Sequence, residues 1–493
     1  AATLAYNING NEKLKMKLDE MVERLLATQL PDGYMGTYGE RYTFMALPEN
    51  DMKTELADDI QPTSKKVNSQ ANDKAPGGGW DTWTIRYNIY GLLTYEKYFP
   101  NENIVEACKK MGDLLIKYYG EGKYDLSKYG TRQGISATTL LESIVMLYER
   151  TLDEKYLDFA ERIVKVSEEN PKHRLMGTML KKGSVVYPGD GKGYQLMANL
   201  LGYLRLYRCT GNAKYLQSVL NGWYEIQEKH VLTTGGPWTR KMPYNGNKEC
   251  FAKTDAFHPE KIVVEGCNNA TWMQLNIHLF ELTGNAKYFN EAEIALLNST
   301  YGHQYSDGIE WCYYMSPNED RPKYEPRFHC CGSSQPRGME MYSNHLAGII
   351  DGNLSINTLS ASKIEIPKQF GSGILNIESG FPLKQSSSIY LNPIESKGFS
   401  LEFRLPLNTS IKQVLVNKKK IEILKTNRGF YQIYRTWKKG DEITIDYEYE
   451  LKVSIQEGEK GKKWVAFTYG PIALAQKIER TPGDEPFSNI EIG

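Results

Sequence analysis

Long hydrophobic runs and an excess of either charge are both absent from this sequence. No uninterrupted apolar stretch approaches the roughly 18 residues that a helix needs to cross a bilayer, so no membrane span is expected. The 60 lysines and arginines equal the 60 aspartates and glutamates in number, which gives a formal net charge of zero. A balanced chain has no electrostatic reason to bind nucleic acid or an anionic membrane surface. Neither class of partner is therefore expected.

Cysteine is scarce for the length of the chain, with seven cysteines in 493 residues. Their odd number and irregular spacing do not form a disulfide framework. The sequence also does not open on a secretory signal, because LAYNINGNEKLKMKLDEMVERLLATQ already has the spacing of a helix. We therefore expect the chain to begin inside a domain.

Aromatic residues, in contrast, are abundant, with 34 tyrosines and 8 tryptophans. Proteins that handle carbohydrates are often rich in aromatics, but tyrosine also fills hydrophobic cores, so the composition leaves both readings open. A hydrophobic content of 40% in a chain of this length is enough for two or more domains, each with its own core.

The first two thirds of the sequence have the apolar periodicity of helices. In TTLLESIVMLYERT, for example, Leu140, Ile144 and Leu147 recur on one face. A short pattern that contains Lys-Tyr predicts tight turns between antiparallel helices. It occurs as YEKYF at 95–99, TLDEKYL at 151–157, TGNAKYL at 210–216 and TGNAKYF at 283–289. Helical hairpins repeated in this way predict an (α/α) barrel, and an irregular helical bundle is the alternative.

Beyond about residue 346 the apolar period changes to two, which is typical of strands. The stretch SLEFRLPL alternates from Leu401 to Leu407, and EITIDYEYELKVSI alternates from Ile443 to Ile455. Short strands separated by turn signals such as KKGDE predict an antiparallel β-sandwich.

These patterns predict a mainly α chain with added β structure and two parts. The first is a helical barrel over 1–345, and the second is a β-sandwich over 346–493. The polar residues 40–80 are predicted to form a long loop at the rim of a pocket. Because the sequence stops soon after the predicted strand WVAFTYGPIALAQ, the β-sandwich is expected to be incomplete.

Four potential metal ligands occur as two close pairs. Glu265 and Cys267 lie in VVEGCNNATW, and Cys330 and Cys331 lie in FHCCGSSQPRG. Three thiolates and a carboxylate satisfy the tetrahedral coordination of zinc, and the alternative is that these are ordinary buried cysteines. Glu249, in GNKECFAKTD, is a carboxylate that could act as a general acid/base near such a cluster. Taken alone, a glutamate in a polar loop is usually only solvated.

Together, the motifs resemble those of the bacterial β-L-arabinofuranosidases, a zinc-dependent family of retaining glycoside hydrolases. The similarity extends over nearly the whole chain and rests on LLATQLPDGYMGTY, GGWDTWTIRYNIYGLL, ECF, EGC and HCCGSSQPRG. It implies an (α/α)6 barrel followed by β-sandwich modules. It also implies that Cys330 is the nucleophile and Glu249 the general acid/base. The zinc ligands that the resemblance implies are Glu265, Cys267, Cys330 and Cys331.

The resemblance gives the adjacent thiols separate tasks. Most retaining glycosidases use two carboxylates, and here a thiolate that zinc keeps deprotonated would replace one of them. Cys331 would anchor the metal while Cys330 attacks the anomeric carbon. Glu249 would protonate the departing oxygen and later activate water.

The predicted substrate pocket departs from the family in the side chains that it offers. The family supplies pocket histidines from central helices, but the corresponding stretches 131–142 and 190–202 contain no histidine, and the second offers Tyr194 instead. Arg86 and Arg132 would add positive charge, which favours an acidic sugar. The predicted substrate-binding residues are Gln29, Trp83, Arg86 and Tyr194.

We therefore predict a retaining glycoside hydrolase with bound Zn²⁺ that releases β-L-arabinofuranose or a related sugar from oligosaccharides or the glycan side chains of plant polysaccharides. One alternative keeps the fold and machinery but takes a different, acidic or branched sugar. Another is an unsaturated-uronyl hydrolase or lyase without zinc, and a third is a noncatalytic carbohydrate-binding relative with structural zinc. The oligomeric state stays open, a dimer being one option. The expected compartment is the bacterial periplasm or cytoplasm.

Overall fold

The computed structural model describes residues 1–37, 80–129, 132–241, 248–318 and 329–475. The chain divides into two compact units, which are described separately. Unit 1 comprises Ala1–His230 and Pro237–Lys253, and unit 2 comprises Val231–Gly236 and Thr254–Gly493. The loop predicted over 40–80 lies outside the described residues except for Trp80. The predicted boundary between 345 and 346, and the closure of the helices into a barrel, stay predictions.

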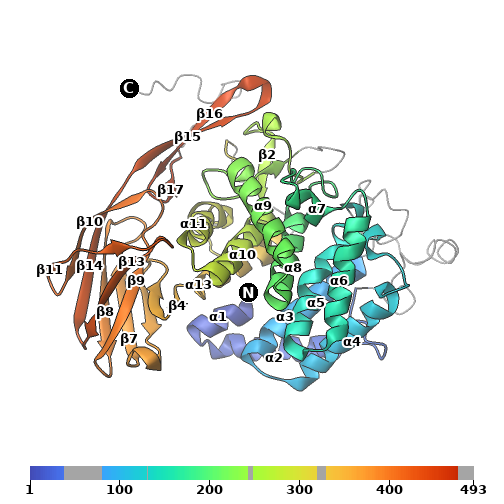
Figure 1. The fold of residues 1–493 in the computed structure, drawn as a ribbon, viewed down its shortest axis with the longest axis horizontal. Helices are drawn as coiled ribbons and strands as arrows, with labels where there is room; N and C mark the ends of the chain where they lie inside the picture. Colours follow the sequence, from blue (N-terminus) through green and yellow to red (C-terminus); the bar gives the residue numbers. More distant parts are fainter. Residues whose placement is uncertain (38–79, 130–131, 242–247, 319–328, 476–493) are drawn as a thin grey trace. The chain divides into compact units, whose positions relative to one another are not determined.

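The described residues of unit 1 form helices and a short strand. Their bounds are α1 (Ala2–Asn9), α2 (Glu12–Leu26), α3 (Trp80–Tyr98), α4 (Glu102–Tyr119), α5 (Leu140–Thr151), α6 (Glu154–Glu169), α7 (Leu175–Leu180), α8 (Gly193–Thr210), α9 (Ala213–His230) and β1 (Thr239–Arg240). Helices α3, α5 and α8 pack side by side, and each packs against the helix that follows it, α4, α6 or α9 (Figure 1). The unit is therefore a double layer of helical hairpins.

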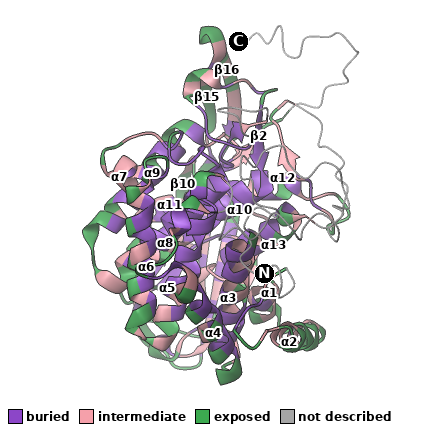
Figure 2. Ribbon diagram, turned by 90° about the vertical axis from the view of Figure 1, so that its right-hand side faces the viewer, coloured by how far each residue is buried: buried purple, intermediate pink, exposed green. Residues whose placement is uncertain are grey.

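The two layers differ in how far their helices are buried. Helix α8 is buried along almost all of its length, whereas α6 buries one face and exposes the other (Figure 2). An amphipathic helix suits an outer position, and a helix that is apolar on most sides suits an inner one. The sequence thus directs α8 to the interior of unit 1.

Three of the four predicted turns are confirmed, and each consists of the same local elements. The preceding helix ends at a threonine, the next residue has a left-handed conformation, and an Asp or Asn side chain then accepts a hydrogen bond from the backbone N–H two residues on. These residues are Thr151, Leu152 and Asp153; Thr210, Gly211 and Asn212; and Thr283, Gly284 and Asn285.

The turn predicted at 95–99 was wrong. These residues form the last turn of α3, which ends at Tyr98. The capping side chain comes only at Asn101, which accepts a hydrogen bond from the N–H of Asn103 in α4. Without a capping residue before the Lys-Tyr pair, the helix continues through it.

The first part of unit 2 is mainly helical. Its elements are β2 (Ile262–Glu265), α10 (Gly266–Thr283), α11 (Ala286–Ile294), a π-helical turn (Ala295–Thr300), α12 (Tyr301–His303), β3 (Tyr314–Met315) and α13 (Cys330–Ser343). Helix α10 is buried nearly throughout and packs against α11 and α13. Strand β2 leads directly into α10, and β3 pairs with β2 in an antiparallel arrangement.

The second part of unit 2 is a pair of packed sheets. Their strand orders are β11-β10-β14-β8-β7-β6 and β12-β13-β9-β5-β4. The strands are β4 (Ala347–Ile350), β5 (Asn353–Ile356), β6 (Ser362–Glu365), β7 (Gly373–Ser379), β8 (Ser386–Pro393), β9 (Lys397–Phe403), β10 (Thr409–Val416), β11 (Lys419–Lys420), β12 (Leu424–Lys425), β13 (Tyr431–Trp437) and β14 (Asp441–Tyr449). Leu391, Phe403 and Ile445 belong to the core between them. The predicted fold class, helices followed by mainly antiparallel β structure, is confirmed, although β5 and β9 pair in parallel.

The long alternating run after Ile443 is not one strand facing one core. Strand β14 ends at Tyr449, and β15 (Leu451–Glu457) pairs instead with β16 (Lys463–Tyr469), which is followed by β17 (Ile472–Ala473). Leu451, Val453 and Ile455 are exposed in the described structure, whereas Ile443 and Ile445 are buried. The alternation continues through both strands, but only β14 lies opposite a second sheet.

None of the helices in the described residues is both long enough and apolar enough to cross a membrane.

Candidate active site

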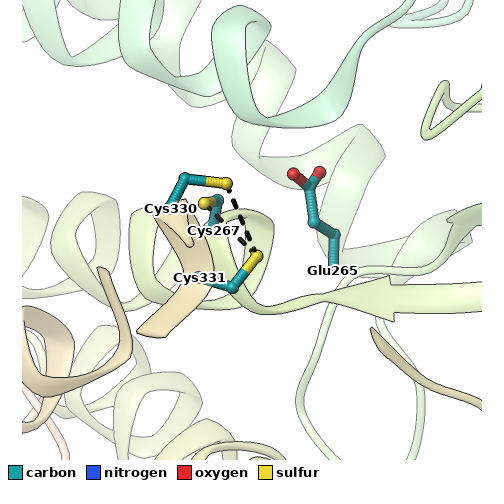
Figure 3. Close-up of side chains that lie close together, drawn as sticks. All are labelled: Glu265, Cys267, Cys330 and Cys331. Atoms are coloured by element: carbon teal, nitrogen blue, oxygen red, sulfur yellow. Dashed lines mark hydrogen bonds between the residues drawn. The ribbon is translucent and has the colours of Figure 1, made fainter. Parts of the chain in front are cut away.

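Three cysteines and a glutamate converge in unit 2 (Figure 3). The carboxylate of Glu265 and the sulfurs of Cys267, Cys330 and Cys331 all lie within 4.8 Å of one another. The Sγ of Cys331 lies 3.4 Å from that of Cys267 and 3.9 Å from that of Cys330. Among the described residues this is the one group of His, Cys, Asp or Glu side chains that could hold a metal ion.

Local structure explains how the two sequence pairs meet. Glu265 is the last residue of β2, and Cys267 lies in the first turn of α10. A Cβ at Gly266 would lie 2.8 Å from the Cβ of Cys331, so the residue between the two ligands has to be glycine for α13 to approach. Cys330 and Cys331 begin α13. Two helix N-termini, which favour negative charge, therefore meet at the cluster.

The three sulfurs differ in exposure. Cys267 and Cys331 are buried, and Cys330 is exposed. The Cys330 sulfur lies 3.3 Å from the hydroxyl of Tyr313, whose ring stacks on His329. The Nδ1 of His329 accepts a hydrogen bond from the N–H of Gly332 and so caps α13. The exposed thiol is thus held at the capped start of a helix.

The protein atoms alone favour the protonated thiols. The hydrogen bond with Cys330 and burial raise the pKa of Cys267, and burial together with Cys267 raises the pKa of Cys331. A cation bound among them would reverse this preference, because a coordinating thiol loses its proton.

The residues fit a zinc ion. Three sulfurs and one carboxylate oxygen are a donor set that zinc takes in tetrahedral sites, and sulfurs bound at about 2.3 Å would lie roughly 3.8 Å apart. The observed separations of 3.4 and 3.9 Å are close to that value. All seven cysteines are free thiols, so none of the three cysteine ligands is lost to a disulfide.

Glu249 lies in unit 1 among charged side chains. Its carboxylate accepts a hydrogen bond from the Nζ of Lys192, and the Nη2 of Arg132 lies 3.8 Å from the same oxygen. The Nη1 of Arg132 also pairs with Asp190 at 3.1 Å. Glu249 is buried and has a positive φ of 61°. The residue is therefore not the solvated loop glutamate that its sequence context alone suggests.

The four predicted substrate-binding residues lie in unit 1 and differ in their contacts. Trp83 is partly exposed, and its ring makes an edge contact with Tyr194 at 5.4 Å. Arg86 is buried, with Nη2 3.1 Å from Glu142 and Nη1 3.4 Å from the Tyr194 hydroxyl. The amide of Gln29 donates to backbone carbonyls, one of them at Ala107. Arg86 and Gln29 are thus already engaged within the protein.

Sequence reasoning did not identify Lys192, Asp190 or Tyr313. Lys192 and Asp190 lie in YPGDGKGYQ, a Gly-rich stretch in which nothing marks a buried lysine. The only signal was indirect, since this stretch lacks the histidine that the family resemblance led us to expect. Tyr313 is one of many tyrosines, and no pattern links it to Cys330.

Comparisons with known proteins identify the family. The profile of the β-L-arabinofuranosidase GH127 catalytic domain matches residues 1–344, and that of the GH127 middle domain matches residues 353–449. The solved structure of BT3674, a GH127 β-arabinofuranosidase, is 20% identical over 96% of this chain and 73% of its own, with a TM-score of 0.72. That of Ara127N-Se, a GH127 β-L-arabinofuranosidase from Geobacillus stearothermophilus T6, is 18% identical over 96% and 74%, with a TM-score of 0.70. No curated protein sequence was found to match.

The two kinds of match support different statements. At these identities the solved structures show the fold, and the catalytic-domain profile spans more than half of the chain. The chain therefore belongs to the GH127 β-L-arabinofuranosidase family of glycoside hydrolases.

Proposed function

We propose that this chain is a retaining glycoside hydrolase in which Cys330 is the nucleophile and Glu249 is the general acid/base. The observation that carries the proposal is the difference in exposure within the thiol cluster, because Cys330 is exposed while Cys267 and Cys331 are buried. A nucleophile has to reach the anomeric carbon, which a buried thiol is unable to do. The buried thiols and Glu265 would hold a metal ion together with Cys330.

The proposed reaction has two displacements at one carbon. The Sγ of Cys330 attacks the anomeric carbon, the glycosidic C–O bond breaks, and Glu249 gives its proton to the departing oxygen. The Glu249 carboxylate then takes a proton from water, whose oxygen attacks the same carbon and releases the Cys330 thiolate. Two inversions retain the configuration. Glu265, Cys267, Cys330 and Cys331 would hold the zinc ion, which would keep the thiolate ionised at neutral pH.

The sugar that we propose is neutral β-L-arabinofuranose, released from an oligosaccharide or a glycan side chain of a plant polysaccharide. The alternative of an acidic sugar rested on the positive charge that Arg86 and Arg132 would offer. Arg86 pairs with Glu142 and Arg132 with Asp190, so a carboxylate on the sugar would have to compete with these partners. The ring of Trp83, which is partly exposed, suits the apolar face of a neutral sugar.

The test compares Cys330→Ser with Cys331→Ser on a 4-nitrophenyl β-L-arabinofuranoside. Cys330→Ser should abolish turnover while the other three ligands still retain some zinc. Cys331→Ser should lose zinc first and activity with it, so added zinc should restore part of the activity of Cys331→Ser and none of that of Cys330→Ser. If added zinc affected both variants equally, Cys330 and Cys331 would both be structural zinc ligands and neither would be the nucleophile. Wild-type protein that holds zinc but cleaves no aryl furanoside or pyranoside would favour a noncatalytic binding protein.

A further inference from the structure

Lys192 is a buried lysine whose ammonium group points at the carboxylate of Glu249. Its side chain is 5% exposed, which is unusual, because burying an ammonium ion is unfavourable unless a partner neutralises it. The partner is Glu249, whose Oε2 accepts the hydrogen bond. The reaction proposed above does not use Lys192.

The backbone fixes this ion pair on two paired segments. Lys192 and Cys250 form an antiparallel bridge, the N–H of Gly193 donates to the carbonyl of Glu249 at 3.2 Å, and the N–H of Phe251 donates to Gly191 at 2.8 Å. The φ of 61° at Glu249 is a left-handed conformation that non-glycine residues seldom adopt. The surroundings therefore force Glu249 toward Lys192.

The described charged groups around this pair balance one another. Arg132 lies between Asp190 and Glu249, at 3.1 Å and 3.8 Å respectively. Asp190 in turn accepts a hydrogen bond from the backbone N–H of Lys192 at 3.1 Å. Burial raises the pKa of the neighbouring Cys250 thiol, so that group adds no charge at neutral pH. Two cations thus face two carboxylates, and Lys192 is the cation hydrogen-bonded to Glu249.

We propose that Lys192 is a positioning residue for Glu249, holding its carboxyl group in place and stabilising the carboxylate that remains once the proton has passed to the leaving oxygen. The inference rests on the proposed function, since it needs Glu249 to be the acid/base. The ammonium group itself neither gives nor takes a proton. It makes Glu249 a stronger acid in the first step, because a nearby positive charge favours the ionised form of a carboxyl group.

This role predicts an effect on the pH profile that a structural role would not produce. The first step needs protonated Glu249, so the alkaline limb of kcat/KM reports the loss of that proton. In Lys192→Met the carboxyl group keeps its proton to higher pH, and the limb should move up by about one pH unit or more. Lys192→Arg retains a cation and should stay near the wild-type profile.

The role also predicts a dependence on the leaving group. A weaker acid matters most when the departing oxygen is a poor leaving group. For Lys192→Met we expect kcat/KM at pH values below the alkaline limb to fall by up to about tenfold on an alkyl β-L-arabinofuranoside and much less on the 4-nitrophenyl glycoside. Lys165→Met, which removes an exposed lysine from α6, is the matched control and should change kcat/KM for neither substrate.

The experiment that decides the role is a double-mutant cycle of Lys192→Met and Glu249→Gln, with pH profiles on both glycosides and the melting temperature of each protein. If Lys192 acts through Glu249, Lys192→Met should have little further effect on activity in the Glu249→Gln background, and the losses in melting temperature should be non-additive. If Lys192→Met lowered activity equally at every pH, or if the losses of activity and of melting temperature were both additive, the role of Lys192 would be wrong and Glu249 would remain the acid/base. Full activity of Glu249→Gln on the alkyl glycoside would instead remove the acid/base, and the role of Lys192 with it.

Discussion

The two units neutralise their ionisable clusters by different means. In unit 1 the carboxylates of Glu249 and Asp190 face the cationic side chains of Lys192 and Arg132. In unit 2 the cluster around Cys331 consists of groups that are all neutral or negative, and burial keeps its thiol protonated by raising its pKa. Among the described residues, the carboxylates of the first cluster face cationic side chains. The second would hold thiolates more readily with a bound cation, because a coordinating thiol loses its proton.

The mechanism that we propose would use both kinds of cluster. An acid/base has to exchange a proton in each half of the reaction, and fixed side-chain cations leave its proton mobile. A thiolate nucleophile has to stay ionised throughout, which a divalent metal achieves more fully than a lysine or an arginine. If the comparison is correct, substitutions in the charged cluster of unit 1 should impair proton transfer and leave zinc bound. Substitutions of the zinc ligands should remove zinc and leave the groups of the proton transfer in place.

The largest effect is expected for Glu249→Gln. Loss of general acid/base catalysis typically lowers turnover by about 10²–10⁴-fold, and the loss should be greatest on a substrate with a poor leaving group. The zinc content should stay at that of the wild type, about one ion per chain by elemental analysis, because no metal ligand is changed. Cys267→Ser is the opposite control, in which zinc should fall together with activity. Turnover of Glu249→Gln within two- or threefold of wild type would contradict the assignment.

Unit 2 also contains a buried carboxylate that is neutralised without a metal. The Oε1 of Glu293 lies 2.5 Å from Arg404, and both side chains are 1% exposed. Arg404→Met leaves the Glu293 carboxylate buried without a cation, although the hydroxyls of Tyr342 and Thr358 still donate to it. We therefore expect the free energy of unfolding to fall by about 3–5 kcal/mol in urea titrations. The double variant Arg404→Met/Glu293→Gln should recover much of that loss.

Zinc distinguishes this pair from the thiol cluster. The loss caused by Arg404→Met should be the same with and without a chelator. The loss caused by Cys331→Ser should be seen only against zinc-loaded wild type, since the metal stabilises the folded state that binds it. A chelator-dependent loss in Arg404→Met would mean that the two buried charge systems are not independent.

The histidines extend the comparison to acid pH. In unit 1, burial lowers the pKa of His173 to about 4 and that of His230 to about 3. In unit 2, His278 and His345 flank Glu281 and lower the pKa of that carboxyl group although burial opposes them.

The buried imidazoles of unit 1 should make its stability depend on pH. Unfolded histidine binds a proton below about pH 6.5, and folded His173 does so only near pH 4. The unfolded state therefore binds more protons between these values, and stability falls with decreasing pH by up to about 1.4 kcal/mol per unit for each such group. His173→Gln should flatten this dependence in urea titrations from pH 6.5 to 4, and His258→Gln, a partly exposed control in unit 2, should not. An unchanged slope in His173→Gln would contradict the interpretation.

The elements that the sequence predicted correctly depend on local physics. The turns at Asp153, Asn212 and Asn285 follow from capping side chains within a few residues of each helix end. The alternation after Ile443 did not show where β14 ends and β15 begins, because alternation indicates only that successive side chains point to opposite faces of a strand. Whether Leu451 meets a core depends on a second sheet formed by distant residues.

The residues of the candidate site also divide into those that the sequence identified and those that depend on distant parts of the chain. Glu265, Cys267 and the Cys330–Cys331 pair stand out because close pairs of soft ligands are rare and resemble a known family. Lys192 does not stand out, because its burial results from the pairing of its segment with the segment that contains Glu249. The positive charge expected from Arg86 was cancelled by Glu142, a partner on another helix that no local pattern identifies.

The most direct test of the account is covalent labelling of the nucleophile. A β-L-arabinofuranosyl haloacetamide should alkylate the zinc-loaded wild type at Cys330 alone, as mapped by peptide mass spectrometry, because Cys330 is the exposed thiol of the cluster. The fraction of activity lost should equal the fraction of protein labelled, and added L-arabinose should slow both the labelling and the loss of activity. A label on Cys267 or Cys331, or full labelling of Cys330 with activity retained, would contradict the claim that a thiolate of this cluster attacks the sugar.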